Sequence, residues 1–135
     1  MAGIPIYQTA ILAELAAEVF TIERIPELAE QARERLLRLG YRNIRFRTGD
    51  GAAGWPEAAP FDRIMVTAAA ATLPSSWVVQ LARNGRLLSP VGSVSDDDQQ
   101  LVLVEKDTHG NERQRVLHGV RFVPLVTNLL GPRNE

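Results

Sequence analysis

The feature that most constrains the fold is a helical segment flanked by two short strand-like segments. In 26–39, leucine and alanine recur on one face, Pro26 stands where a first helical turn tolerates proline, and Gly40 follows as a C-terminal glycine. Residues 19–23 and 44–48 are short runs with β-branched and aromatic side chains. This strand–helix–strand order predicts an α/β fold.

The neighbouring segments extend the same alternation. Apolar residues at helical spacing predict a helix over 9–17. Residues 61–67 predict a strand, and their apolar centre around Met65 is typical of a buried position in a parallel sheet. A short helix is predicted over 76–82, closed by an Asn-Gly pair, and the next strand over 86–91.

The last third of the sequence changes to β structure. Residues 101–106 and 113–117 flank the polar segment 107–111, a pattern that predicts an antiparallel hairpin with a five-residue turn. Residues 120–125 predict a further strand. The expected architecture is therefore one domain over 1–135, with a mostly parallel sheet and an antiparallel C-terminal hairpin.

Composition narrows the possible chemistry. The chain has 135 residues and no cysteine, which excludes a disulfide scaffold, a thiol nucleophile and any zinc site with sulfur ligands. Its net charge of −1 argues against a broad surface for nucleic acid or anionic membranes. No apolar run has the length of a membrane span, and the start lacks the basic residues of a secretory leader, so a cytoplasmic protein is expected. Three consecutive aspartates at 96–98 are more typical of a solvated loop than of a metal site, so no metal is expected.

Acidic and small residues follow the predicted strands where ligands of α/β proteins bind, at the carboxyl ends. Glu23 ends one strand, Asp50 follows another, and residues 67–71 follow a third. An acid in the first of these positions commonly accepts hydrogen bonds from a ribose diol, and an acid followed by glycine can bind an adenine amino group. Taken singly, Glu23 is also readable as a solvated acid near a helix start, and Asp50 as a turn residue.

Several short sequence motifs occur in the order and spacing of the protein-L-isoaspartate O-methyltransferase family, which the chain resembles from Tyr7 to Leu125. They are Tyr7-Gln8-Thr9-Ala10, Ile22-Glu23-Arg24-Ile25-Pro26-Glu27-Leu28-Ala29, Gly49-Asp50-Gly51, Phe61-Asp62-Arg63-Ile64-Met65-Val66-Thr67-Ala68-Ala69-Ala70, Gly85-Arg86-Leu87, Pro90-Val91-Gly92, Val104-Glu105-Lys106 and Val120-Arg121-Phe122-Val123-Pro124-Leu125. The resemblance implies a Rossmann-like methyltransferase fold. It also implies methyl transfer from S-adenosylmethionine to the side carboxyl of isoaspartyl residues in damaged proteins.

The resemblance further implies roles for eight residues. The cofactor-binding residues are Glu23 on the ribose hydroxyls, Asp50 on the adenine amino group, Gly51 beside it, and Thr67 and Ala68 near the transferring methyl group. The residues on the side of the peptide substrate are Ala69, Val123 and Pro124. No residue is assigned as a catalytic acid or base, because in-line methyl transfer mainly needs alignment and exclusion of water.

The chain departs from the family pattern at its start. The family has three alternate glycines before the Tyr-Gln-Thr-Ala word, and these positions hold Ala2, Ile4 and Ile6 here. The family's N-terminal region, its serine-containing substrate loop and its first strand have no counterpart in the 135 residues. We therefore expect catalysis to be lost or severely impaired, with a non-catalytic binding or assembly module as the alternative. In the family the first strand lies between the strands at 19–23 and 61–67, so its loss predicts a homo-oligomer, most simply a dimer.

Overall fold

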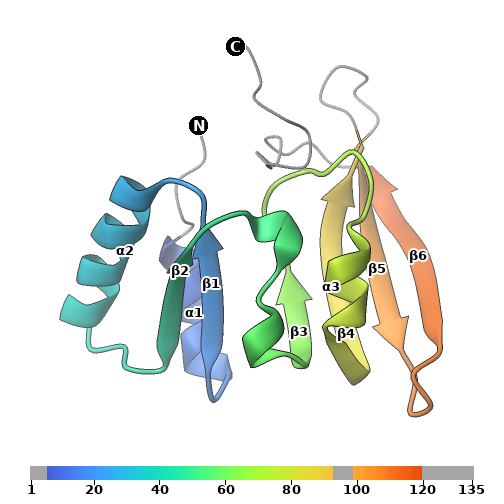
Figure 1. The fold of residues 1–135 in the computed structure, drawn as a ribbon, viewed down its shortest axis with the longest axis horizontal. Helices are drawn as coiled ribbons and strands as arrows, with labels where there is room; N and C mark the ends of the chain where they lie inside the picture. The colour runs from blue at the N-terminus through green and yellow to red at the C-terminus, as the bar shows by residue number, and fades with distance from the viewer. Residues whose placement is uncertain (1–5, 93–98, 120–135) are drawn as a thin grey trace. The chain divides into compact units, whose positions relative to one another are not determined.

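The computed structural model describes residues 6–92 and 99–119 (Figure 1). It consists of two compact units, the first ending at Gly51 and the second beginning at Ala52. The expectation of a single domain over 1–135 stays a prediction. The expected strand at 120–125 and the aspartates at 96–98 lie outside the described residues.

The first unit contains two helices and a parallel pair of strands. Its elements are α1 (Ile6–Leu15), β1 (Val19–Glu23), α2 (Pro26–Arg38) and β2 (Ile44–Thr48). The two strands pair in parallel, in a register that places Val19 opposite Ile44 and Glu23 opposite Thr48. Both strands have the predicted bounds. Helix α1 begins and ends earlier than predicted, and α2 ends one residue before the predicted end.

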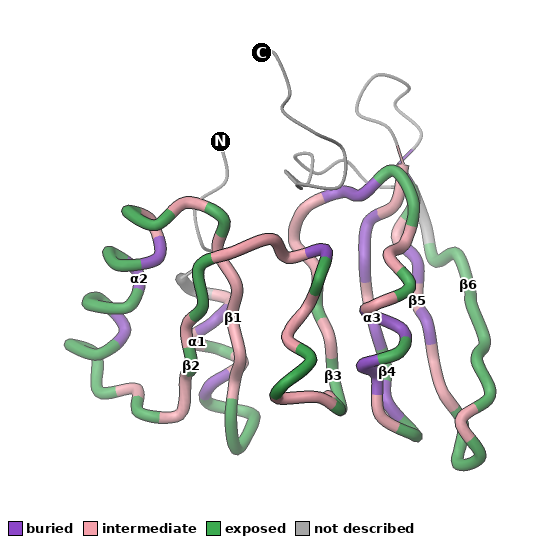
Figure 2. Tube along the Cα trace, in the orientation of Figure 1, coloured by how far each residue is buried: buried purple, intermediate pink, exposed green. Residues whose placement is uncertain are grey.

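Helix α2 forms where local chemistry favours it. Pro26 occupies the first turn, where its missing N–H would have no partner in the helix. Gly40 has a φ of +94° just beyond the last turn, a conformation that glycine adopts without a steric penalty. On the covered side of the helix Ala29 and Ala32 are buried and pack against Phe46 of β2 (Figure 2). Packing of this apolar face against β2 stabilises the helix, which would be only marginally stable on its own.

The second unit is built on a four-stranded sheet. Its elements are the 3₁₀ turns η1 (Gly51–Ala53) and η2 (Pro56–Ala58), the strands β3 (Phe61–Met65), β4 (Leu81–Val91), β5 (Gln100–Lys106) and β6 (Glu112–Gly119), and the helix α3 (Ser75–Val79). The strand order is β3-β4-β5-β6. Strands β3 and β4 are parallel, whereas β4–β5 and β5–β6 are antiparallel.

The core of the second unit lies between α3 and this sheet. Trp77 and Val78 of α3 pack in one buried cluster with Leu87 and Val104, both of which are fully buried (Figure 2). Trp77 is only 4% exposed, so its large ring is almost wholly inside this core. Because Leu87 and Val104 pair directly across β4 and β5, they present one continuous apolar surface to the helix.

The predicted strand over 86–91 is confirmed as part of a longer strand, whereas the predicted end of the preceding helix at residue 82 is wrong. Helix α3 ends at Val79 and β4 already begins at Leu81, which pairs with Phe61 of β3. The Asn-Gly signal marks a bulge inside β4, where Asn84 has a φ of 62° and the ladder skips from Phe61 to Arg63. A residue pair that tolerates positive φ suits a helix end and a bulge equally, so the sequence alone did not separate them.

The expected burial of Met65 is also wrong, since its side chain is 44% exposed. Strand β3 pairs only with β4 among the described residues, so it is an edge strand of its sheet. A buried position in a parallel sheet needs a paired strand on each side, and the ladders of the described residues give β3 one such partner.

The strands of the described residues form two sheets, not one. No ladder joins β1 to β3 within 6–92 and 99–119, and each is an edge strand of its own sheet. Two ladders are parallel and two are antiparallel, so the antiparallel part extends beyond the predicted hairpin to include β4. The described fold is thus α/β with mixed strand pairing.

The predicted hairpin is confirmed, and Asp107 organises its turn. The Asp107 carboxylate accepts hydrogen bonds from the main-chain N–H groups of His109 and Asn111, at 2.8 and 2.9 Å, and from Asn111 Nδ2 at 3.0 Å. These bonds to Asn111, main-chain first, favour the ionised form and hold the pKa of Asp107 below its ordinary value of 3.8.

We predict that Asp107→Ala lowers the melting temperature at neutral pH and that this difference shrinks in acid. A lowered pKa in the folded state means that ionised Asp107 stabilises the fold above its unfolded pKa, and that the stabilisation is lost as the pH falls through the folded pKa. Thermal melts of both proteins at neutral pH and below pH 3.8 measure the effect. Asp62→Ala, an exposed aspartate on β3, is the control; an equal difference at both pH values would contradict the role of the charge.

Candidate binding site at the carboxyl ends of the strands

Glu23 occupies the last position of β1 and shapes the turn into α2. Its side chain is half-buried, and Oε1 accepts a hydrogen bond from the main-chain N–H of Ile25 at 3.1 Å. Ile25 is the residue from which α2 begins. Glu23 is therefore not simply a solvated acid: its carboxylate is held at the strand end by the start of the following helix.

The parallel pairing brings Glu23 and Asp50 to the same end of the first sheet. The last residue of β2, Thr48, pairs with Glu23, and the N–H of Gly49 donates to the Glu23 main-chain oxygen at 2.9 Å. Asp50 is the next residue along the chain and is half-buried, and Gly51 begins the 3₁₀ turn η1. Two half-buried carboxyl side chains thus follow neighbouring parallel strands at their carboxyl ends.

Small residues follow β3 in the second unit. Thr67 and Ala68 are half-buried, and Ala69 is buried with 4% of its surface exposed. The next residue, Ala70, continues alongside β4: its N–H donates to Pro90, and its oxygen accepts from the N–H of Gly92 at 2.8 Å. Because the backbone runs so close to the neighbouring strand, alanine fits here where a larger side chain would have to displace it.

The structure therefore brings together only some of the predicted site residues. Glu23, Asp50 and Gly51 lie at one end of the first unit's sheet, and 67–69 follow β3 in the second unit. Val123 and Pro124 are outside the described residues. The roles assigned to all these residues stay predictions.

Sequence reasoning missed two polar side chains, one in α3 and one directly after it, that hold the segment after Gly51. Gln80 makes two hydrogen bonds to the backbone of this segment, and Ser76 Oγ donates to the main-chain oxygen of Ala52. The signal was present as a glutamine inside the otherwise apolar run 77–82. A buried amide needs polar partners, and a loop with free backbone groups is where such partners are found.

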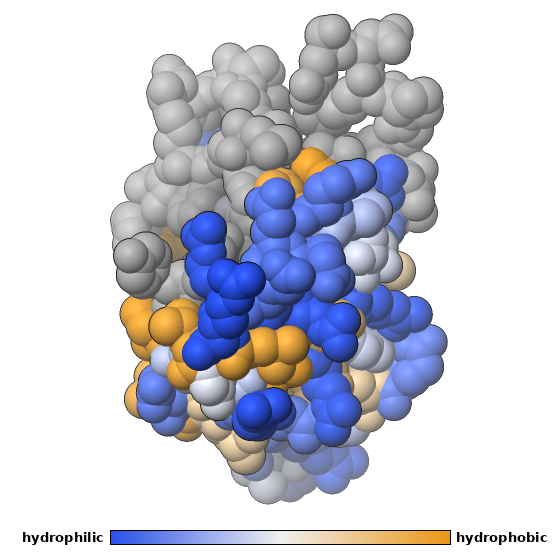
Figure 3. Space-filling model, turned by 90° about the vertical axis from the view of Figure 1, so that its left-hand side faces the viewer, coloured by the Kyte–Doolittle hydropathy of each residue, from blue (hydrophilic) through white to orange (hydrophobic). Residues whose placement is uncertain are grey.

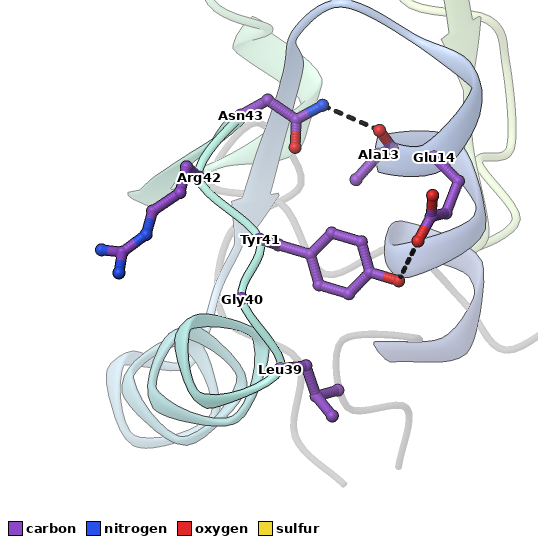
Figure 4. Close-up of a pocket in the computed structure, with 7 residues that line it drawn as sticks. All are labelled: Ala13, Glu14, Leu39, Gly40, Tyr41, Arg42 and Asn43. Atoms are coloured by element: carbon purple, nitrogen blue, oxygen red, sulfur yellow. Dashed lines mark hydrogen bonds between the residues drawn. The ribbon is translucent and has the colours of Figure 1, made fainter.

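A shallow hollow of about 340 Å³ lies elsewhere in the first unit (Figure 4). Tyr41 Oη donates to Glu14 Oε1 at 2.9 Å, and Asn43 Nδ2 donates to the main-chain oxygen of Ala13 at 2.8 Å. The bond to Glu14 is the main reason that the pKa of Tyr41 is raised above 10.0. The hollow contains none of the predicted site residues.

The first unit also has exposed apolar side chains on its surface, one of which lines this hollow. The face shown in Figure 3 carries apolar groups next to strongly hydrophilic ones. The exposed large apolar side chains of the unit are Ile11, Leu15, Leu37 and Leu39, and Leu39 also lines the hollow. Surface side chains of this kind are common singly and do not by themselves define a ligand.

The described residues show neither a cluster of metal ligands nor a membrane-spanning helix. Within 6–92 and 99–119 there is no group of three or more His, Cys, Asp or Glu residues arranged to hold a metal ion. In the same part of the chain, no helix is both long and apolar enough to cross a membrane.

The order strand, helix, parallel strand in the first unit places the chain in the class of Rossmann-like α/β folds. The family model described as protein-L-isoaspartate(D-aspartate) O-methyltransferase (PCMT) matches residues 3–130. The chain belongs to this family.

Curated relatives match with high identity. A protein-L-isoaspartate O-methyltransferase 1 from Anaeromyxobacter sp. is 58% identical over 120 residues, which are 88% of this chain and 56% of the relative. A protein-L-isoaspartate O-methyltransferase from Gloeobacter violaceus is 50% identical over 119 residues, covering 88% of this chain and 57% of the relative. The chain thus spans little more than half the length of these relatives.

Solved structures agree with the fold. A protein-L-isoaspartate O-methyltransferase structure superposes with a TM-score of 0.82 at 28% identity, over 91% of this chain and 39% of the other. A structure from Plasmodium falciparum, described as this methyltransferase in complex with S-adenosyl-L-homocysteine, gives a TM-score of 0.71 at 27% identity, over 90% of this chain and 58% of the other.

Proposed function

We propose that the chain carries the S-adenosylmethionine site of a protein-L-isoaspartate O-methyltransferase fold. The observation that supports this most is the placement of Glu23 and Asp50 after neighbouring parallel strands, in a chain whose family match extends over residues 3–130. A similar structure contains S-adenosyl-L-homocysteine, the demethylated form of the cofactor.

The chemistry of the two carboxylates fits the adenosine half of this cofactor. One oxygen of Glu23 accepts from Ile25, and a carboxylate has acceptor sites on both oxygens, so the group can also accept from a ribose diol. Asp50 accepts from the adenine amino group, and Gly51 lets the base approach the backbone. The bound cofactor supplies an electrophilic methyl group on a sulfonium sulfur.

The small residues after β3 suit the methyl end of the cofactor. In this proposal Thr67 and Ala68 contact the cofactor and Ala69 contacts the peptide, a role that the family resemblance also gives to Val123 and Pro124. Small side chains and backbone groups align two reactants and exclude water without competing for the transferred group. The acceptor is the side carboxyl of an isoaspartyl peptide, the substrate class named in the family description.

We propose further that these 135 residues bind the cofactor without turning it over. The serine-containing loop with which the family grips the isoaspartyl backbone has no counterpart among them. Binding and alignment are separable, since the carboxylates that hold adenosine belong to other segments than the substrate loop.

Calorimetric titration with S-adenosyl-L-homocysteine tests the site. The wild-type chain is expected to bind at roughly micromolar Kd, about −8 kcal/mol. Asp50→Ala should weaken binding by about 1–3 kcal/mol, because it leaves the buried amino group without an acceptor. Glu30→Ala, at an exposed position of α2, should leave the affinity unchanged. No heat and no thermal stabilisation of the wild type at millimolar ligand would refute the proposal.

A second candidate function is an assembly module, and the positions of β1 and β3 at the ends of their sheets favour it. Strands β1 and β3 each end a sheet among the described residues. A free strand edge is a template for pairing with another chain. We propose a homodimer in which such an edge is paired by the second copy.

A further inference from the structure

The segment after Gly51 is fastened to α3 by side chains. It begins with the 3₁₀ turn η1 and continues through Gly54 to Trp55. Ser76 Oγ donates to the oxygen of Ala52, and the amide of Gln80 bonds the next part of the segment at two points. Three of its backbone groups therefore have partners from α3 or from the residue directly after it.

Gln80 uses both ends of its amide. Its Oε1 accepts from the N–H of Trp55 at 2.8 Å, and its Nε2 donates to the oxygen of Ala53 at 3.0 Å. The residue is only 7% exposed. Loss of one partner would leave the other polar groups buried and unpaired, which costs far more than the same bond does on the surface.

Gln80 is itself fixed by the fold. Its N–H donates to the oxygen of Ser76 at 3.1 Å, and its own oxygen accepts from the N–H of Phe61, the first residue of β3, at 2.8 Å. The two residues before Val79 in α3, Trp77 and Val78, are buried in the core of the second unit. The amide thus projects from a point that both the helix and the sheet hold in place.

Gly54 shows how closely the segment approaches this amide. Its φ is +66°, and a Cβ built there would clash with Gln80 Oε1. The backbone consequently packs on the amide with no space for a side chain.

The geometry points to Gln80 as a positioning residue for the adenine side of the cofactor site. The turn that it holds begins at Gly51, directly after Asp50, and its last residue, Ala53, accepts the Gln80 hydrogen bond. Restricting η1 restricts the backbone on which Asp50 and Gly51 stand, so the binding conformation is formed before the ligand arrives. This inference rests on the proposed function.

The test uses amide hydrogen exchange and ligand affinity in the full chain. In Gln80→Met, the Trp55 N–H loses its acceptor, and its protection from exchange should fall roughly tenfold or more. The Phe61 N–H, which donates to the main-chain oxygen of Gln80, should keep its protection and so report an intact fold. If the competent turn falls to about a tenth of the population, the Kd for S-adenosyl-L-homocysteine rises about tenfold.

Two further variants keep the test decisive. Gln80→Glu keeps an oxygen acceptor for the Trp55 N–H but loses the donor to the oxygen of Ala53, so Trp55 should be better protected than in Gln80→Met while the Kd stays raised. Gln31→Met makes the same chemical change on the exposed side of α2 and should alter neither readout.

Each outcome decides the inference. Lost Trp55 protection together with a raised Kd supports it. Unchanged Trp55 protection overturns it, and so does lost protection with unchanged affinity, which would make Gln80 a purely structural residue. A wild-type chain that binds no S-adenosyl-L-homocysteine refutes the proposed function itself, a result seen before any variant is made.

Discussion

A polypeptide of these 135 residues should transfer no detectable methyl group to an isoaspartyl peptide. Positioning of two reactants supplies about 7–11 kcal/mol of a transfer barrier, and the family's substrate loop has no counterpart in this sequence. The rate should therefore fall by several orders of magnitude relative to a complete enzyme. Incorporation of labelled methyl groups from S-adenosylmethionine into a synthetic isoaspartyl peptide measures it.

The Anaeromyxobacter relative, 58% identical over the matched residues, is the positive control for this assay. Ordinary aspartyl peptide of the same sequence is the substrate control. Turnover by the 135-residue chain that disappears in Glu23→Ala would show that the site works without the loop, and the prediction would be wrong.

The second prediction with a large effect is that the chain forms a dimer in solution. If the edge of β3 is paired by a second copy, light scattering after size exclusion should give twice 14.9 kDa at micromolar concentration. Met65→Lys should return the chain to the monomer mass, because a lysine on an edge strand opposes strand addition. Met65 is 44% exposed, so the fold should tolerate the change.

Val79→Lys is the matched control for the dimer. Val79 is 77% exposed on α3, and a lysine there should leave the mass doubled. A wild-type monomer with cooperative unfolding would refute the dimer. If both lysine variants had the monomer mass, the dissociation of the dimer would not be specific to the strand edge.

The elements that local chemistry determines were predictable from the sequence. The bounds of β1 and β2 are as predicted, and α2 begins at Pro26 as expected. In each case a signal within a few residues, such as a proline in the first turn or strict alternation, is sufficient. The hairpin around Asp107 is of the same kind, because its turn is held by bonds between residues two and four positions apart.

The features that depend on distant neighbours were not predictable. Whether Asn84 ends a helix or bulges from a strand depends on the pairing of β4 with β3, twenty residues earlier. The exposure of Met65 depends on whether a further strand lies beside β3, which its own sequence does not reveal. Gln80 was missed for a similar reason, since its partners Ala53 and Trp55 lie 27 and 25 residues away.

The candidate site likewise has features that the sequence predicted and features that only the structure revealed. The positions of Glu23 and Asp50 followed from the rule that ligands bind at the carboxyl ends of parallel strands, and the pairing of β1 with β2 confirms that both follow one sheet end. Their half-buried state, and the hydrogen bond that Glu23 accepts from Ile25, required the structure.

Mapping of S-adenosyl-L-homocysteine by amide chemical shifts tests the central claim, which is that the carboxyl ends of these strands bind the cofactor. Titration of the labelled chain should shift the N–H signals of Glu23, of 49–51 and of 67–69 together, with one saturation curve. Signals of the residues around Tyr41, which line the separate hollow, should stay in place. Shifts confined to that hollow, or no shifts at millimolar ligand, would contradict the account.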